Sequence, residues 1–316
     1  MKKFWQLGLS AILAVLMLVG CSGDTAEDSL QVEETSEIED VAQAFPVTVT
    51  DAQGTDITIE QAPKKIISLI PSNTEILFSL GLDEQIIGVN DYDNFPEAVT
   101  EKERVGGIEF NLEQIIALQP DIVFAHESGL YVMGEGIAQL EAAGVKVFVV
   151  KDAVDFDETY ETIEQIGLLT GKSQEATKII ADIKTKLTNI EEKVAGLEAK
   201  SVFVVVGTDP DIYAAGTGTF IDEMLQIIGV KNAVETDGWP MYSSEQFVAS
   251  NPNTIIVTYE NDIESINTNE AYAIMDAVKN GKVILVDGDT TSRQGPRLAE
   301  GVESIAKAVY PEAFGE

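Results

Sequence analysis

A chain of 316 residues with 54 acidic and 20 basic side chains carries a formal net charge of −34 at pH 7. Because nucleic acid phosphates are bound by basic surface, this charge argues against a nucleic acid partner. The chain has one cysteine and one histidine. It therefore cannot form an internal disulfide, and it lacks the several His or Cys ligands that a zinc or manganese site usually uses. We expect no cofactor.

Residues 1–20 have the organisation of a secretory signal. Lys2 and Lys3 precede an uncharged apolar run over residues 4–19, and Gly20 and Cys21 follow it. A basic segment, a short apolar segment and small residues before the cleavage site are typical of exported proteins. The sequence Leu-Val-Gly-Cys at its end resembles a bacterial lipobox, so we predict that Cys21 is acylated and becomes the mature N-terminus. An ordinary signal peptide and an uncleaved anchor are the alternatives.

Residues 22–44 contain acidic side chains, no basic ones and few bulky apolar ones. Such a segment cannot bury enough surface to fold, so we predict a disordered acidic tether. It would join an extracytoplasmic body to a lipid anchor in the cell membrane. Apolar residues then alternate with polar ones over residues 45–60, which predicts a short hairpin. No later apolar run is long enough to span a bilayer.

Residues 45–171 alternate strand-like and helix-like runs and form the predicted N-terminal lobe. Strands are expected at 66–70, 86–89, 121–125 and 145–150, and residues 72–75 are predicted to form a capping box that opens the first helix. This alternation indicates a mainly parallel sheet, which binds ligands at the carboxyl ends of its strands. Tyr92, and His126 in the loop after the third of these strands, both follow strand ends, so we expect both to face a cleft.

The segment 172–200 is predicted to be one long helix. Its large apolar residues recur at steps of three and four: Ile179, Ile183, Leu187, Ile190, Val194 and Leu197. The other faces are charged, so this is an amphipathic helix and not a membrane span. At 1.5 Å per residue it would be roughly 40 Å long. We interpret it as a rigid connector between two lobes; a long helix inside a single domain is the alternative.

Residues 201–316 repeat the α/β plan as a C-terminal lobe. Strands are expected at 201–206, 254–258 and 283–286, and helices at 220–228, 271–278 and 296–309. The predicted fold is therefore α/β, with two Rossmann-like lobes joined by one long interdomain helix. The loops of the second lobe carry candidate ligand-binding side chains, namely Tyr213, Trp239, Tyr242, Asp289 and Arg293.

An internal repeat relates the two lobes. Glu113, Gln114, Ala117 and Pro120 recur as Glu245, Gln246, Ala249 and Pro252, at a constant offset of 132 residues. Each copy opens with an N-cap residue and a Gln three residues later, the arrangement of a capping box. A short helix, a proline turn and a strand-like run follow.

The catalytic signals of a hydrolase are missing from the sequence. There is no Gly-x-Ser-x-Gly motif, and a lone histidine without a positioned nucleophile cannot serve a catalytic triad. Aromatic and polar side chains at strand ends are typical of a site that binds an organic ligand and leaves it unchanged. We expect a binding protein and not an enzyme, with a cleft hydrolase as the competing hypothesis.

Three segments carry a family resemblance: residues 65–77, residues 111–123, and Gly238-Trp239-Pro240 with the nearby Ser243-Ser244-Glu245. They resemble the helical-backbone, class III substrate-binding proteins of ABC importers, which include receptors for cobalamin, haem and ferric siderophores. The resemblance covers residues 64–309 and is strongest to the cobalamin receptors. In those receptors a tyrosine, a tryptophan and an aspartate contact the ligand, and Tyr92, Trp239 and Asp289 match them by position. Two further tryptophans of the family are not matched, because Ile108 and His126 stand near the positions where they would fall.

The resemblance implies an extracytoplasmic lipoprotein that binds cobalamin or a related corrinoid in the interlobe cleft and delivers it to an ABC permease. A haem or ferric-siderophore receptor is the alternative. His126 is either a polar wall residue or an axial ligand of the bound chelate. Arg293 and Arg297 pair either with carboxylates or with an anionic ligand. The family docks on its permease through one surface acid in each lobe, and Glu113 and Glu245 match these positions. We expect a monomer.

Overall fold

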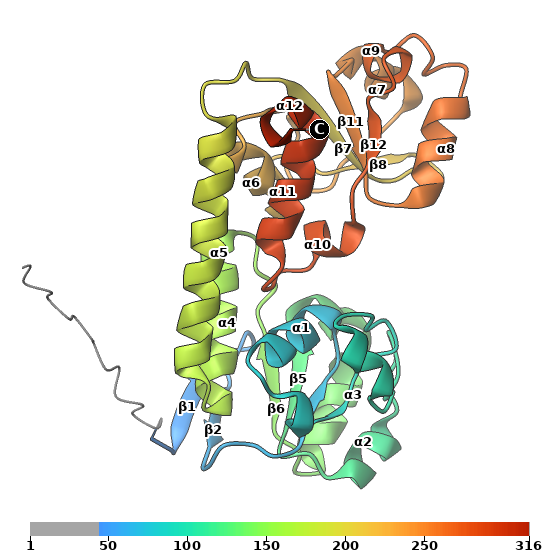
Figure 1. Ribbon diagram of the computed structural model, residues 1–316. Coiled ribbons are helices and arrows are strands. Elements are labelled where there is room, and N and C mark those ends of the chain that lie inside the picture. The colour runs from blue at the N-terminus through green and yellow to red at the C-terminus, as the bar shows by residue number, and fades with distance from the viewer. Residues whose placement is uncertain (1–43, 316) are drawn as a thin grey trace, which may run out of the picture. The chain divides into compact units, whose positions relative to one another are not determined.

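The computed structural model describes residues 44–315 (Figure 1). The predicted signal peptide, Cys21 and all of the tether except Ala44 lie outside the described residues. Within residues 44–315, none of the helices combines the length and the apolar character needed to cross a membrane.

The described chain begins with the predicted hairpin. Strands β1 (Val47–Thr50) and β2 (Asp56–Ile59) pair antiparallel, with Val47 opposite Ile59. The turn between them is organised by Asp51, whose Oδ1 accepts hydrogen bonds from the backbone N–H groups of Gln53 and Thr55 at 2.9 and 2.8 Å. The N–H of Ala52 donates to the carbonyl of Val149 at 2.9 Å, which ties the hairpin to the neighbouring sheet.

The first sheet has four parallel strands in the order β4-β3-β5-β6. The strands are β3 (Ile66–Ser68), β4 (Ile86–Gly88), β5 (Ile122–His126) and β6 (Val147–Val150). The helices that alternate with them are α1 (Pro71–Ser79), α2 (Leu112–Leu118), α3 (Leu130–Ala142) and α4 (Phe156–Thr170). The predicted parallel sheet is confirmed, and its carboxyl ends face the loops that follow β3, β4, β5 and β6.

The second sheet has six strands and is mixed. Its order is β10-β8-β7-β11-β12, with β9 also paired to β7. The strands are β7 (Ser201–Gly207), β8 (Ile212–Ala214), β9 (Lys231–Asn232), β10 (Met241–Tyr242), β11 (Thr254–Val257) and β12 (Val283–Leu285). The sequence did not predict β8 and β10, which run antiparallel to their neighbours at one edge. They are only three and two residues long, too short to show an alternating pattern.

Seven helices accompany the second sheet in residues 201–315: α6 (Phe220–Ile227), α7 (Ser244–Ser250), α8 (Glu260–Thr268), α9 (Asp276–Lys279), α10 (Gly288–Ser292), α11 (Leu298–Val309) and α12 (Pro311–Phe314). The helix predicted over 271–278 is wrong in its first half, because α9 begins only at Asp276. Tyr272 and Met275 donate backbone hydrogen bonds to the carbonyls three residues before them, so this stretch forms turns.

The long helix α5 (Ser173–Val194) lies in the chain between the segments of the two sheets. It packs against α4 and α11, as Figure 1 shows. Its buried residues are Ala176, Ile180, Ile183, Leu187, Ile190 and Val194. They belong to one hydrophobic cluster that also contains residues of β3, β5, β7 and β11.

The predicted length of this helix is wrong at its C-terminal end. The helix has 22 residues, about 33 Å at 1.5 Å per residue, and stops at Val194 rather than near residue 200. Gly196 adopts a left-handed φ of 79°, which a continuing helix does not allow. Leu197, the last apolar residue of the predicted stripe, is exposed and lies outside the helix.

The internal repeat corresponds to α2 and α7, which have seven residues each. Asn111 and Ser243 are their N-caps and accept hydrogen bonds from the N–H groups of Gln114 and Gln246. The residue after each helix, Gln119 or Asn251, is left-handed, with φ of 51° and 33°, although neither is glycine. The two copies thus share their N-cap bond and their turn geometry. The predicted capping box is complete only in α7, where Gln246 accepts from the Ser243 N–H at 3.0 Å; in α2 the Gln114 side chain donates to Glu103 instead.

Candidate functional site

An apolar pocket of about 240 Å³ lies at the carboxyl ends of β3, β4 and β5. Leu69 and Ile70 follow β3, Asn90 and Tyr92 follow β4, and Ser128 and Gly129 follow β5. The remaining wall consists of Pro71, Gly107, Ile108, Val132 and Met133. Tyr92, Ile108 and Val132 are 60%, 61% and 51% exposed, so three large apolar side chains remain open to solvent at this pocket. Such a surface favours contact with an apolar face of a ligand.

The buried Asn90 holds the loop that presents Tyr92. Its Nδ2 donates to the carbonyls of Leu69 and Gly107 at 2.8 and 3.1 Å, and its Oδ1 accepts from the N–H of Tyr92 at 2.9 Å. A Cβ atom on Gly107 would lie 2.9 Å from Cε2 of Tyr92, so the aromatic ring rests directly on this glycine. The predicted position of Tyr92 beside a pocket agrees with this geometry.

A second cavity of about 250 Å³, the polar pocket, adjoins the first and shares Ile70, Pro71 and Ser128 with it. Its other lining residues are Ser72, His126, Asp152, Ser292, Arg293 and Gln294. Three of these, Ser72, His126 and Asp152, belong to the segment of the first sheet or to the loop after β6. The other three end α10 or follow it. The polar pocket therefore lies where the segments of the two sheets meet.

His126 is the last residue of β5 and is only 3% exposed, so its prediction as a loop residue is wrong. The strand extends one residue further than its sequence suggests because His126 pairs with Val150 of β6. Its Nδ1 lies 2.8 Å from Oγ of Ser128 and accepts a hydrogen bond from the Ser128 N–H at 3.3 Å. Burial lowers the pKa of the His126 ring, and the carboxylates of Asp152 and Glu127 partly oppose this effect.

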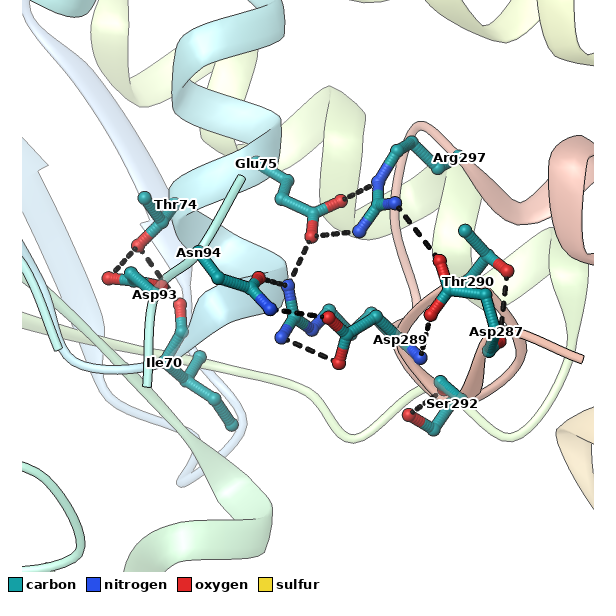
Figure 2. Close-up of polar contacts among 12 residues, drawn as sticks. Ile70, Thr74, Glu75, Asp93, Asn94, Asp287, Asp289, Thr290, Ser292 and Arg297 are labelled. Carbon is teal, nitrogen blue, oxygen red and sulfur yellow. Dashed lines mark hydrogen bonds and ion pairs between the residues drawn. The ribbon is translucent and has the colours of Figure 1, made fainter. Parts of the chain in front are cut away.

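An ion cluster centred on the buried Glu75 joins α1 to the segment between α10 and α11 (Figure 2). One oxygen of Glu75 accepts from Nη1 of Arg293 and from Nη2 of Arg297, and the other accepts from Nε of Arg297, all at 2.7 Å. Asn94 bridges the same region, because its Oδ1 accepts from Arg293 at 2.8 Å and its Nδ2 donates to Asp289 at 2.7 Å. The Arg297 guanidinium also lies 4.1 Å from the centre of the Phe95 ring.

This cluster corrects the predicted capping box at residues 72–75. The N-cap of α1 is Ile70, and Pro71 occupies the first turn, where its missing N–H costs nothing. Ser72 therefore lies inside the helix, and its Oγ has no partner among the described residues. Glu75 points to two arginines more than 200 positions away in the chain rather than to its own helix end. Of the two roles considered for Arg293, pairing with carboxylates is the one the structure contains; the side chain also lines the polar pocket.

Asp93 belongs to the same loop as Tyr92 and Asn94, but its side chain is buried. Its Oδ2 accepts from Oγ1 of Thr74 at 2.9 Å and from the N–H of Asn90 at 2.8 Å. Desolvation by burial raises the pKa of Asp93 to about 6, and these two hydrogen bonds and the charges of Arg104 and Arg293 oppose the rise.

Three predicted aromatic residues line neither pocket. Tyr213 lies in β8 opposite Met241, and Tyr242 packs edge-on against Phe203 in the core of the second sheet, with ring centroids 5.2 Å apart. Trp239 is 55% exposed in the turn before β10. The structure thus brings Tyr92, His126 and Arg293 to adjoining pockets and places Asp289 beside Arg293, while these three aromatics lie elsewhere.

The acids predicted to dock on a permease occupy equivalent places. Glu113 lies in the first turn of α2 and Glu245 in the first turn of α7, and both are exposed. Near a helix N-terminus a carboxylate is favoured by roughly 0.3–1 kcal/mol. This local effect accounts for both acids even without a partner.

Sequence reasoning missed several features that build the site: Asn94, Asp152, Met133 and the contact of Glu75 with the arginines. No local pattern marks them, because their contacts join segments that are distant in the chain. Within residues 44–315, no group of three or more His, Cys, Asp or Glu side chains is arranged to hold a metal ion.

Comparison with known proteins places this geometry in a family. The family model described as "Periplasmic binding protein" matches residues 66–290. The chain is 39% identical over the whole length of both proteins to an uncharacterized ABC transporter substrate-binding lipoprotein of Bacillus subtilis (strain 168). It is 26% identical to a cobalamin-binding protein of Halobacterium salinarum, over 86% of this chain and 76% of that protein.

A solved structure agrees with these matches. A possible iron-binding, periplasmic solute-binding protein from Staphylococcus epidermidis ATCC 12228 superposes with a TM-score of 0.73 at 37% identity, covering 79% of this chain and 100% of that one. Both the sequence and the fold of residues 66–290 therefore lead to the same assignment: the chain belongs to the periplasmic binding protein family, in its class III branch.

Proposed function

We propose that this chain is the extracytoplasmic substrate-binding lipoprotein of an ABC importer and that it binds cobalamin or a related corrinoid. The observation that carries the proposal is the pair of adjoining pockets at the carboxyl edge of the first sheet. One is apolar and bears the exposed Tyr92, and the other is polar and is completed by residues around α10. Together the two cavities fall within the range of about 300–1,000 Å³ that is usual for small-molecule sites.

A corrinoid matches both kinds of surface. The face of its macrocycle is apolar and would lie against Tyr92, Ile108 and Val132, while its polar side chains would reach the polar pocket. The names of the relatives support a metal chelate as the ligand, because one is a cobalamin-binding protein and another a possible iron-binding protein. A haem or ferric-siderophore receptor is the second candidate, and the iron-binding relative favours it.

The proposal divides the chain into two lobes. Residues 45–171 would form the N-terminal lobe, residues 172–200 the connector that contains α5, and residues 201–316 the C-terminal lobe. The ligand would lie between them, beside the contact of Glu75 with Arg293 and Arg297. Trp239 and Tyr213 would approach the ligand from the second lobe, and Tyr242 would support them from the core.

Delivery would require a permease and a membrane anchor. Glu113 and Glu245 are exposed at equivalent helix starts, which supports a docking role with one acid for each permease subunit. The lipobox sequence at Cys21 supports attachment of a monomer to the outer face of the cell membrane. Cys21→Ala should release the protein from membranes without changing its ligand affinity, and retention of that variant would indicate an uncleaved anchor.

Visible absorbance and calorimetric titration of the purified protein test the ligand. We expect cyanocobalamin or cobinamide to bind with a shifted visible spectrum and without chemical change. Tight binding of haemin or a ferric siderophore, with no binding of corrinoids, would establish the second candidate instead. Conversion of the ligand during incubation would identify a cleft enzyme and overturn the receptor assignment.

A further inference from the structure

The hydrogen bonds of His126 determine which ring nitrogen carries its proton. The backbone N–H of Ser128 points at Nδ1 from 3.3 Å, and an N–H donor needs a lone pair on its acceptor. A proton on Nδ1 would face that donor, so the neutral ring carries its proton on Nε2. Burial lowers the pKa of this ring, which favours the neutral form at physiological pH.

The Nε2 atom is the free end of this side chain. His126 is 3% exposed and lines the polar pocket, yet within residues 44–315 its Nε2 has no hydrogen-bond partner. The buried side-chain atoms without a hydrogen-bond partner do not include Nε2, so this atom is accessible to solvent. Ser128 holds the ring through Nδ1, and the Nε2–H on the opposite side of the ring is open to the pocket. This N–H can therefore donate to a ligand.

The charges around the pocket exclude a strong anion site. Arg293 already donates to Glu75 and Asn94 and pairs with Asp289 at 2.7 Å, so its positive charge is balanced. Asp152 adds a carboxylate to the pocket wall, and only a weak bond of 3.3 Å from Gln294 engages it. A ligand carboxylate would therefore lie beside a negative charge with no unpaired cation nearby. A group that both donates and accepts hydrogen bonds fits better.

We propose that the polar pocket binds a neutral carboxamide of the ligand. The Nε2–H of His126 donates to the amide oxygen, and the carboxylate of Asp152 accepts an amide N–H. This inference rests on the proposed function, which it deepens: it selects a chelate with amidated side chains over one with free carboxylates. It also assigns His126 as a hydrogen-bond donor, which replaces the hypothesis that it coordinates the metal of the chelate.

A matched pair of ligands tests the proposal. Dicyanocobinamide carries amides where dicyanocobyrinic acid carries carboxylates on the same corrin ring. We expect the amide form to bind at least tenfold more tightly. Asp152→Asn should reduce the ratio of the two affinities about tenfold, because the asparagine side chain can donate a hydrogen bond to a ligand carboxylate. His126→Phe should weaken the amide form about tenfold, the effect expected for one lost hydrogen bond of roughly 1.4 kcal/mol. The control Asp182→Asn removes an exposed charge on α5 and should leave the ratio unchanged.

His126 is the only histidine in the chain, so its ring gives a single set of ¹⁵N signals. We expect the Nε2–H tautomer in the free protein at pH 7.5, and a shifted Nε2 signal that keeps its proton when the amide ligand binds. An Nδ1–H tautomer, loss of the Nε2 proton on binding, or equal affinity for both ligands in the wild type and in Asp152→Asn would overturn the inference. These outcomes leave a corrinoid receptor standing. Failure of both corrinoids to bind the wild type would instead overturn the proposed function together with the inference.

Discussion

Glu75→Gln offers a direct test of the ion cluster that joins α1 to the segment between α10 and α11. The carboxylate is 2% exposed, and the guanidinium groups of Arg293 and Arg297 are 13% and 12% exposed. It accepts three hydrogen bonds of 2.7 Å from these two arginines. The substitution keeps the shape of the side chain but removes its charge and turns one acceptor into a donor.

The expected loss of stability is large because two mostly buried arginines would lose the buried carboxylate that they share. Removing one member of a buried ion pair costs about 3–5 kcal/mol, most of it the penalty of a buried charge left without compensation. For a domain of this size, 1 kcal/mol corresponds to about 2–4 °C in Tm, so we expect a decrease of roughly 6–20 °C. The companion variant Glu75→Gln/Arg297→Gln should recover part of the loss, because it removes one of the two arginines that share Glu75.

The loss of stability is measured by thermal and urea unfolding, monitored by far-ultraviolet circular dichroism. Glu235→Gln is the matched control, since its pair with Lys231 is exposed on both sides and should leave the Tm unchanged. If Glu75→Gln changed stability by less than about 0.5 kcal/mol, as a typical surface substitution does, the three contacts would contribute nothing to folding and the reasoning would be refuted.

Burial raises the pKa of Asp93 from 3.8 to about 6. The folded protein therefore binds this proton more tightly than the unfolded chain does. The resulting stabilisation is fully present below pH 3.8 and is lost as the pH rises through 6. Asp93→Asn should therefore be up to roughly 3 kcal/mol more stable than wild type at pH 8 and equal to it at pH 3.5, and urea unfolding with no such difference would contradict the pKa. Tyr92→Ala should weaken ligand binding by about 1–3 kcal/mol in calorimetry while the Tm stays constant; a lower Tm with unchanged affinity would make Tyr92 a structural residue. Trp239→Ala should also weaken binding, because Trp239 would approach the ligand from the second lobe, and unchanged affinity would remove it from the site. Glu113→Lys with Glu245→Lys should abolish uptake and permease binding but preserve ligand affinity, whereas normal uptake would leave both acids as helix-stabilising residues.

Much of the architecture is encoded in short-range patterns of the sequence. The apolar stripe at Ile183, Leu187, Ile190 and Val194 predicted the buried face of α5, because a helix brings residues three and four apart to one side. The strands of the first sheet were predicted from β-rich apolar runs between turn signals. The repeat at an offset of 132 residues predicted that Asn111 and Ser243 cap α2 and α7, and both do, although the full capping box forms only in α7.

The site depended on contacts that no local pattern contains. Residues 72–75 have the spacing of a capping box, but Glu75 binds arginines that lie 218 and 222 positions away. His126 reads as a loop residue, but pairing with Val150 draws it into β5 and buries it. Tyr242 was predicted as a ligand-binding loop residue, but it lies in the antiparallel strand β10 and its ring packs against Phe203. In each case the free energy of a tertiary contact, whether an ion pair, a strand pairing or a ring contact, exceeds the local preference of the residue, and that contact forms only when distant segments meet.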